Sequence, residues 1–119
     1  MKSCSVVPRK RGDTTASEQL VRKFADRFWE TDWPGSSHPS VFYDPRALDH
    51  EGPDGVLHAK AVVADDEAVF VTSANLTEAA LDRNIELGVL LRDRALALTI
   101  GGYFRRLIDR DLLKPLPLA

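Results

Sequence analysis

His58 and Lys60, two positions apart, are the residues of this chain best suited to chemistry. An imidazole can attack phosphorus as a nucleophile, and a lysine ammonium can stabilise negative charge on a phosphate oxygen. Both residues lie in the otherwise apolar stretch 56–64, which predicts a β-strand. Because side chains at positions i and i+2 of a strand share one face, the two groups are expected to point the same way. The pair therefore predicts a site for a phosphodiester.

More polar residues follow this pair at fixed offsets. Asp65 comes shortly after Lys60, and a corner that carries Ser73 and Asn75 follows a second predicted strand. Five specified positions of this kind recur by chance in a chain this short with a probability of about one in ten thousand or less. The pattern resembles the HKD motif of the phospholipase D superfamily.

The resemblance runs over residues 43–93 and, more weakly, to the C-terminus. The superfamily carries a glutamate just past an asparagine at the start of the next strand, and Asn84 and Glu86 occupy those places. One position departs from the pattern: the superfamily usually has glycine before the serine of the corner, and Thr72 stands there. The backbone at this corner therefore cannot use the conformational freedom of glycine.

The resemblance implies a metal-independent phosphodiesterase that works through a phosphohistidine intermediate. It implies that His58 is the nucleophile, that Lys60 holds a non-bridging phosphate oxygen, and that Glu86 accepts a hydrogen bond from His58 Nδ1. Asp65 belongs to the motif, although its place at a predicted turn indicates a structural role. The predicted catalytic residues are thus His58, Lys60, Asp65 and Glu86, and the predicted substrate-binding residues are Lys60, Ser73 and Asn75.

Within the superfamily, the runs 41–48 and 72–80 resemble the phospholipase-D-like component of the bacterial DISARM anti-phage system. This likeness favours a nuclease-like activity on nucleic acid in phage defence, with defence-system proteins as partners. A phospholipid-cleaving phospholipase D is the alternative substrate class. A catalytically inactive lobe that acts as an accessory or interaction module is the alternative from outside the enzymes.

The chain carries a single His-x-Lys pair. The superfamily mechanism needs a second histidine, because the leaving alkoxide must be protonated by a group other than the nucleophile. A symmetric homodimer could supply it, or the chain could be the second half of a two-lobe enzyme whose N-terminal lobe is missing. Activity of the isolated chain is therefore an open question at the sequence level.

Size and composition indicate one small globular domain. The chain has 119 residues, of which 44% are hydrophobic and 29% charged, and its net charge of -2 argues against coating nucleic acid through bulk charge. A single cysteine, the absence of an apolar run of about 20 residues and the absence of a signal peptide predict a cytoplasmic protein. The acidic groups at 49–54 and 65–67 lack histidine at ligand spacing. We therefore predict no metal and no other cofactor.

Periodicity and turn residues predict an α/β fold. The resemblance implies that it is one phospholipase-D-like lobe with a mixed β-sheet flanked by helices. Residues 1–13 are expected to form a flexible segment, and 14–119 a single domain. Helices are predicted over 17–29, 77–82 and 94–113, with Gly101 and Gly102 weakening or kinking the last one. Strands are predicted over 41–43, 56–64, 68–72 and 85–91, and loops over 33–40 and 44–55. Trp29 and Trp33 are expected to pack against the core and its rim.

Overall fold

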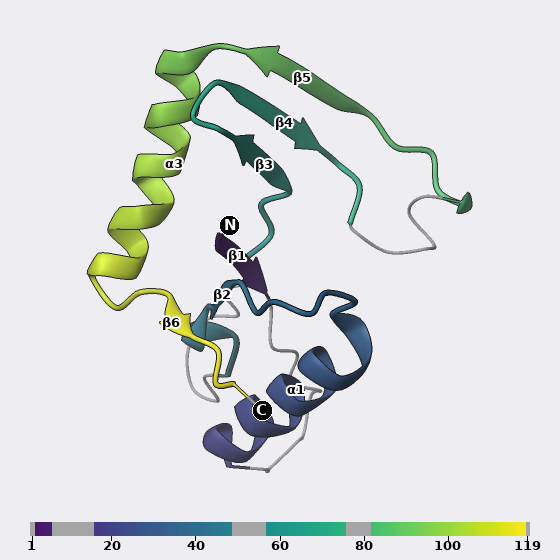
Figure 1. Ribbon diagram of the computed structural model, residues 1–119, viewed down its shortest axis with the longest axis vertical. Helices are drawn as coiled ribbons and strands as arrows, with labels where there is room; N and C mark the ends of the chain where they lie inside the picture. Colours follow the sequence, from purple (N-terminus) through teal and green to yellow (C-terminus); the bar gives the residue numbers. More distant parts are fainter. Residues whose placement is uncertain (1, 6–15, 49–56, 76–81, 119) are drawn as a thin grey trace. The chain divides into compact units, whose positions relative to one another are not determined.

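The computed structural model describes residues 2–5, 16–48, 57–75 and 82–118. The chain divides into two compact units: Met1–Leu57 with Ile108–Ala119, and His58–Leu107. Among the described residues, each unit contains a three-stranded sheet and a helix (Figure 1). The α/β class expected from the sequence is confirmed, and the strands belong to two sheets.

The sheet of the first unit has the order β1-β2-β6. Strand β2, Ser40–Tyr43, pairs in parallel with β1, Lys2–Ser5, and antiparallel with β6, Lys114–Pro115. The prediction for β2 is confirmed to within one residue. Residues 2–5 belong to the segment 1–13 that was expected to be flexible, and their backbone is paired along the whole of β2. Residues 6–13 lie outside the described part.

The helix of the first unit is α1, Ser17–Arg27, and it continues as a π-helical turn, η1, Phe28–Asp32. Val21, Ala25 and Trp29 recur every four residues, so they fall on one face of the helix, and all three are buried. This face belongs to a core completed by Val41, Leu48 and Leu116. The prediction of a helix over 17–29 is confirmed at its start, and Trp29 packs in the core as expected.

Trp29 also ties this helix to the C-terminal segment. Its indole Nε1 donates a hydrogen bond of 2.7 Å to the carbonyl of Pro117. The wider turn at η1 closes with the amide of Trp33 donating to the carbonyl of Phe28 at 2.8 Å. The helix ends at Asp32, and Pro34, which has no amide hydrogen, cannot extend it.

The sheet of the second unit has the order β3-β4-β5, with both pairings antiparallel (Figure 1). Strand β3 is Ala61–Ala64, β4 is Ala68–Thr72 and β5 is Gly88–Arg92. The prediction for β4 is confirmed at both ends. Asp65 and Asp66 both have φ of 53°, the left-handed conformation that tight hairpin turns require, and they join β3 to β4.

Two strand predictions in this unit are longer than the strands observed. The strand predicted over 56–64 begins only at Ala61, so His58 and Lys60 lie in the irregular segment just before it. The strand predicted over 85–91 begins at Gly88 and runs to Arg92. In both cases the hydrophobic pattern continues past the point where regular backbone pairing ends.

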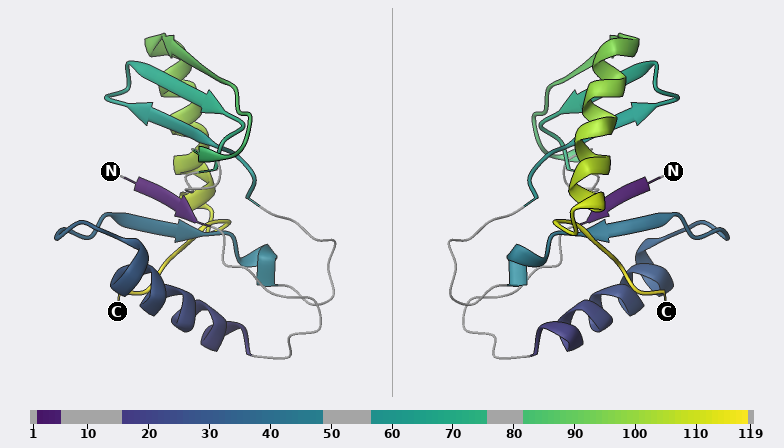
Figure 2. Two further views of the ribbon diagram at one scale, coloured as in Figure 1. Left: turned by 90° about the vertical axis from the view of Figure 1, so that its right-hand side faces the viewer. Right: turned by 90° about the vertical axis from the view of Figure 1, so that its left-hand side faces the viewer.

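Helix α3, Arg94–Asp109, follows β5 and runs along one side of the sheet of its unit (Figures 1 and 2). It stays helical through Gly101 and Gly102 and ends four residues before the predicted end at Leu113. Val69 of β4 and Ala97 of α3 are completely buried. By contrast, Val62, Phe70 and Leu90, which are cross-strand neighbours in the register, are 48%, 39% and 62% exposed.

The helix predicted over 77–82 lies outside the described residues apart from Asp82, and so does most of the loop predicted over 44–55. The described part of that loop forms a short 3-10 helix, η2, Pro45–Leu48. Within the described ranges, no helix combines the length and the apolar character needed to cross a lipid bilayer.

Candidate active site

All residues of the predicted site belong to the second unit, and His58 and Lys60 are in contact. Lys60 Nζ lies 3.3 Å from both His58 Nδ1 and His58 Nε2, and it donates a 2.9 Å hydrogen bond to the carbonyl of His58. An ammonium group has only donors, so it can bond only to the ring nitrogen that carries no proton. The expectation that the two side chains point the same way agrees with this geometry, although neither residue is in the regular strand.

The backbone of Lys60 is hydrogen-bonded to the neighbouring strand. The amide of Thr72, the last residue of β4, donates to the carbonyl of Lys60 at 3.0 Å. Thr72 is in turn the register partner of Gly88 on β5. Lys60, Thr72 and Gly88 therefore form one row across the sheet, at the end of the hairpin away from its turn.

Glu86 is held by the corner residue Ser73 and by its neighbour Asn84. The Ser73 hydroxyl donates to Glu86 Oε2, and Asn84 Nδ2 lies 3.4 Å from Glu86 Oε1. Ser73 Oγ also accepts a 3.1 Å bond from the amide of Leu87. Among the described residues, these partners of Glu86 do not include His58.

The two remaining predicted residues are placed differently. Asn75 is exposed and ends the described part of the corner. Asp65 lies at the β3–β4 turn, so the length of β3 separates it from His58 and Lys60. The structure thus brings together His58 with Lys60, and Ser73 with Glu86, and it does not bring Asp65 to either pair.

Two contributions to the site were not predicted from the sequence. Asn84 contacts the Glu86 carboxylate, a role that its place in the motif does not indicate. Thr72 departs from the usual glycine, and its hydroxyl accepts a 3.0 Å bond from the amide of Ala74. Threonine two residues before an amide at a turn is a known local capping pattern, so the Thr72 contact could have been anticipated.

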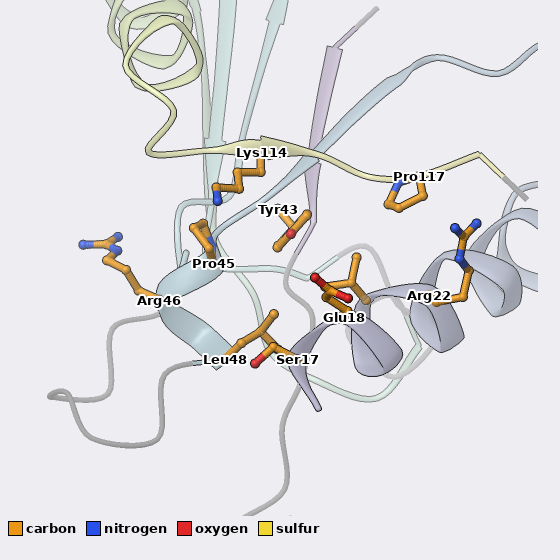
Figure 3. Close-up of a pocket in the computed structure, with 10 residues that line it drawn as sticks. Ser17, Glu18, Arg22, Tyr43, Pro45, Arg46, Leu48, Lys114 and Pro117 are labelled. Atoms are coloured by element: carbon orange, nitrogen blue, oxygen red, sulfur yellow. The ribbon is translucent and has the colours of Figure 1, made fainter. Parts of the chain in front are cut away.

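A shallow depression in the first unit holds none of the predicted catalytic residues (Figure 3). Ser17 and Glu18 of α1, Tyr43 of β2 and Lys114 of β6 line it. Burial raises the pKa of the Tyr43 phenol above its ordinary value of 10.0. The residues that line it include one acidic side chain, Glu18, and three basic ones, Arg22, Arg46 and Lys114.

A family model described as "Cardiolipin synthase, PLD-like domain" matches residues 36–108, which is more than half of the chain. The chain therefore belongs to this family of phospholipase-D-like domains, and the superfamily assignment made from the motif is confirmed.

A curated relative gives a more specific likeness than the family model does. The DISARM protein DrmC of Bacillus paralicheniformis is 37% identical over 60 residues, which cover 44% of this chain and 25% of that protein. The likeness to the DISARM component expected from the sequence is confirmed. The chain spans about a quarter of the length of this curated relative. No solved structure matches.

Proposed function

We propose that this chain is a phosphodiesterase lobe of the phospholipase D superfamily that cleaves phosphodiester bonds through His58. The observation that carries the proposal is the Lys60 ammonium at 3.3 Å from both nitrogens of the His58 ring. A nucleophile and a cation held this close can meet one tetrahedral phosphate together. Membership of the phospholipase-D-like family supports this use of the pair.

In the proposed reaction, an unprotonated ring nitrogen of His58 attacks phosphorus, and the bond from phosphorus to the leaving oxygen breaks. The leaving oxygen takes a proton from a second acid, and water later attacks the phosphohistidine to release the phosphate product and free histidine. Lys60 stabilises the charge that develops on a non-bridging oxygen. No metal ion is required in this scheme.

Glu86 is proposed to orient the ring by accepting the Nδ1 proton of His58. Ser73 and Asn84 each occupy one position on its two oxygens. A carboxylate has about four acceptor positions, so capacity for the imidazole proton remains. Asn75 is proposed as a second phosphate donor, and Asp65 as a turn residue.

Nucleic acid is the favoured substrate, because the matching relative is named as a DISARM protein. Phospholipid is the alternative substrate class. The protein should be incubated with DNA, with RNA and with phosphatidylcholine vesicles, each in excess EDTA. Cleavage of nucleic acid in EDTA is expected, and cleavage of the vesicles alone would assign the lipid alternative.

The nucleophile can be tested directly by acid-free quenching and mass spectrometry. A phosphohistidine at residue 58 is expected during turnover, and His58→Ala should lack both the adduct and the activity. Lys60→Met is expected to lower the cleavage rate at least a hundredfold. Lys23→Met, which removes an exposed lysine of α1, is the matched control and should cleave like the parent. Activity that needs a divalent ion, or that survives in His58→Ala, would contradict the proposal.

One observation favours a second candidate, a catalytically silent accessory lobe. Glu86 bonds to Ser73 and Asn84, so the orienting contact with His58 is not formed in this structure. In a silent lobe the same residues would only stabilise the corner. Unchanged biological protection by the His58→Ala variant, together with no phosphohistidine in the parent, would favour this candidate.

A further inference from the structure

We infer that the hydroxyl of Thr72 is a positioning group for this site, a role that rests on the proposed function. Thr72 is the last residue of β4, at the corner that carries Ser73. Among the described residues, no hydrogen bond joins it to His58. Its hydroxyl bonds within the corner and to Leu87, and its backbone amide bonds to the carbonyl of Lys60.

The hydroxyl of Thr72 both accepts and donates. Thr72 Oγ1 accepts a 3.0 Å bond from the amide of Ala74 and lies 3.4 Å from the carbonyl of Leu87, to which it donates. The first bond closes the turn at the corner, and the second ties the corner to the segment before β5. A hydroxyl has one proton to donate and lone pairs to accept, so both bonds can form at once.

The backbone of Thr72 connects the same corner to the proposed phosphate-binding lysine. Its amide donates to the carbonyl of Lys60 at 3.0 Å, and the next amide, of Ser73, donates to the carbonyl of Leu87 at 3.0 Å. Ser73 then reaches Glu86 with its hydroxyl. Lys60 and Glu86 come from different segments of the chain. Through these bonds, the positions of both depend on the position of Thr72.

Space around Thr72 explains how a branched residue fits at this position. The register partner of Thr72 is Gly88, and a Cβ at residue 88 would lie 3.1 Å from Thr72 Cβ and 2.8 Å from the ring of Phe70. The missing side chain at 88 leaves room for the threonine. A glycine at 72 would fit here too, but it would lose the hydroxyl that caps Ala74.

Two variants separate the hydroxyl from the shape of the side chain. Thr72→Val keeps the branched shape and removes both bonds, and it is expected to lower kcat about tenfold with KM within about twofold. Thr72→Ser keeps the hydroxyl and should stay within about twofold of the parent. Thr99→Val is the matched control, because Thr99 Oγ1 donates to the carbonyl of Ala95 within α3, and it should leave kcat unchanged.

A second measurement distinguishes failure of this inference from failure of the proposed function. Hydrogen exchange of the Ala74 amide, followed by NMR, should be about tenfold faster in Thr72→Val than in the parent and in Thr72→Ser. Equal exchange in all three proteins would overturn the inference whether or not the chain cleaves diesters. Unchanged kcat in Thr72→Val, or a Thr72→Ser protein that is unfolded or as slow as Thr72→Val, would also overturn it. If the parent has no activity but the Ala74 amide exchanges faster in Thr72→Val, the proposed function is rejected. The hydrogen bonds of the Thr72 hydroxyl at the corner are then still supported.

Discussion

Two charged side chains of this protein lie in opposite environments. Lys60 is partly exposed, and its ammonium contacts a ring and a carbonyl while keeping capacity to donate to an incoming anion. Asp44 is completely buried, and its two oxygens accept from the Arg46 guanidinium, the shortest contact being 2.6 Å. Its Oδ1 also accepts from the amide of Arg46 at 3.0 Å. Lys60 therefore keeps donor capacity for the binding role proposed above, and Asp44 holds the start of η2.

Asp44→Asn is expected to lower the free energy of unfolding by about 1–2 kcal/mol near neutral pH, because it breaks a buried charge-assisted contact whose arginine is mostly exposed. The side-chain hydrogen bond from Arg46 lowers the pKa of Asp44 below its ordinary value of 3.8, and burial opposes this shift. Since the folded pKa is the lower one, the stabilisation is complete above about pH 4 and is lost as the pH falls through the folded pKa.

Urea denaturation near pH 7 and near pH 2 measures this effect, and the difference between the parent and Asp44→Asn should shrink at the lower pH. Asp32→Asn is the matched control, because Asp32 forms an exposed ion pair with Arg27 at 3.6 Å. It should change stability by less than about 0.5 kcal/mol. A pH-independent difference for Asp44→Asn would show that packing, and not charge, is responsible.

At the scale of elements, the β3–β4–β5 sheet determines which site residues can meet. The β3–β4 turn sends the chain back so that Thr72 pairs with Lys60, and the β4–β5 register then places Gly88 beside Thr72. The same turn moves Asp65 to the far end of β3. The β3–β4 hairpin and the β4–β5 pairing thus explain why Lys60, Ser73 and Glu86 stay at one end of the sheet while Asp65 does not.

Gly88→Ala is expected to destabilise the protein by about 1–3 kcal/mol, because the new Cβ would overlap the Phe70 ring and press on Thr72. Gly101→Ala is the matched control within α3. Its Cβ would lie 3.4 Å from the flexible guanidinium of Arg105, so this change should stabilise the helix by about 0.5–1 kcal/mol. Urea denaturation of both variants gives the comparison. Equal effects of the two alanines would contradict the close packing at Gly88.

At the scale of the whole molecule, the proposed chemistry needs a proton donor other than the nucleophile His58. One His-x-Lys pair occurs in its 119 residues, and the chain spans about a quarter of the relative it matches. Two arrangements would supply this donor: a second copy of His58 in a symmetric dimer, or a separate lobe on a longer or partner chain.

Mixing the parent with an equal amount of His58→Ala after joint unfolding and refolding tests the dimer. If each active pair needs two intact histidines, random pairing should reduce the activity to about one quarter of the parent value, and not to one half. Light scattering should give twice the chain mass. A reduction to one half, or a strictly monomeric active protein, would favour the separate lobe.

Much of the fold could be predicted because local patterns were strong. The four-residue apolar spacing around Val21 and Trp29 predicted α1, and the run before Thr72 predicted β4 at both ends. Strand β1 was missed because four polar and small residues have no strand pattern of their own, and they are paired only by contact with β2. The end of the strand before Ala61 was also missed, since alternation of side chains does not report where backbone pairing stops.

The sequence by itself determined the family and pointed to the pair of groups that is proposed to do the chemistry, because both depend only on residue types and their spacing. Tertiary structure alone decided which groups meet: the Lys60 ammonium lies 3.3 Å from the ring nitrogens of His58, Glu86 bonds to Ser73 thirteen positions away, and the Thr72 hydroxyl caps the corner at Ala74. Such contacts follow from strand register and turn geometry. These arise from the pairing of whole strands, so no single residue or local spacing could specify them.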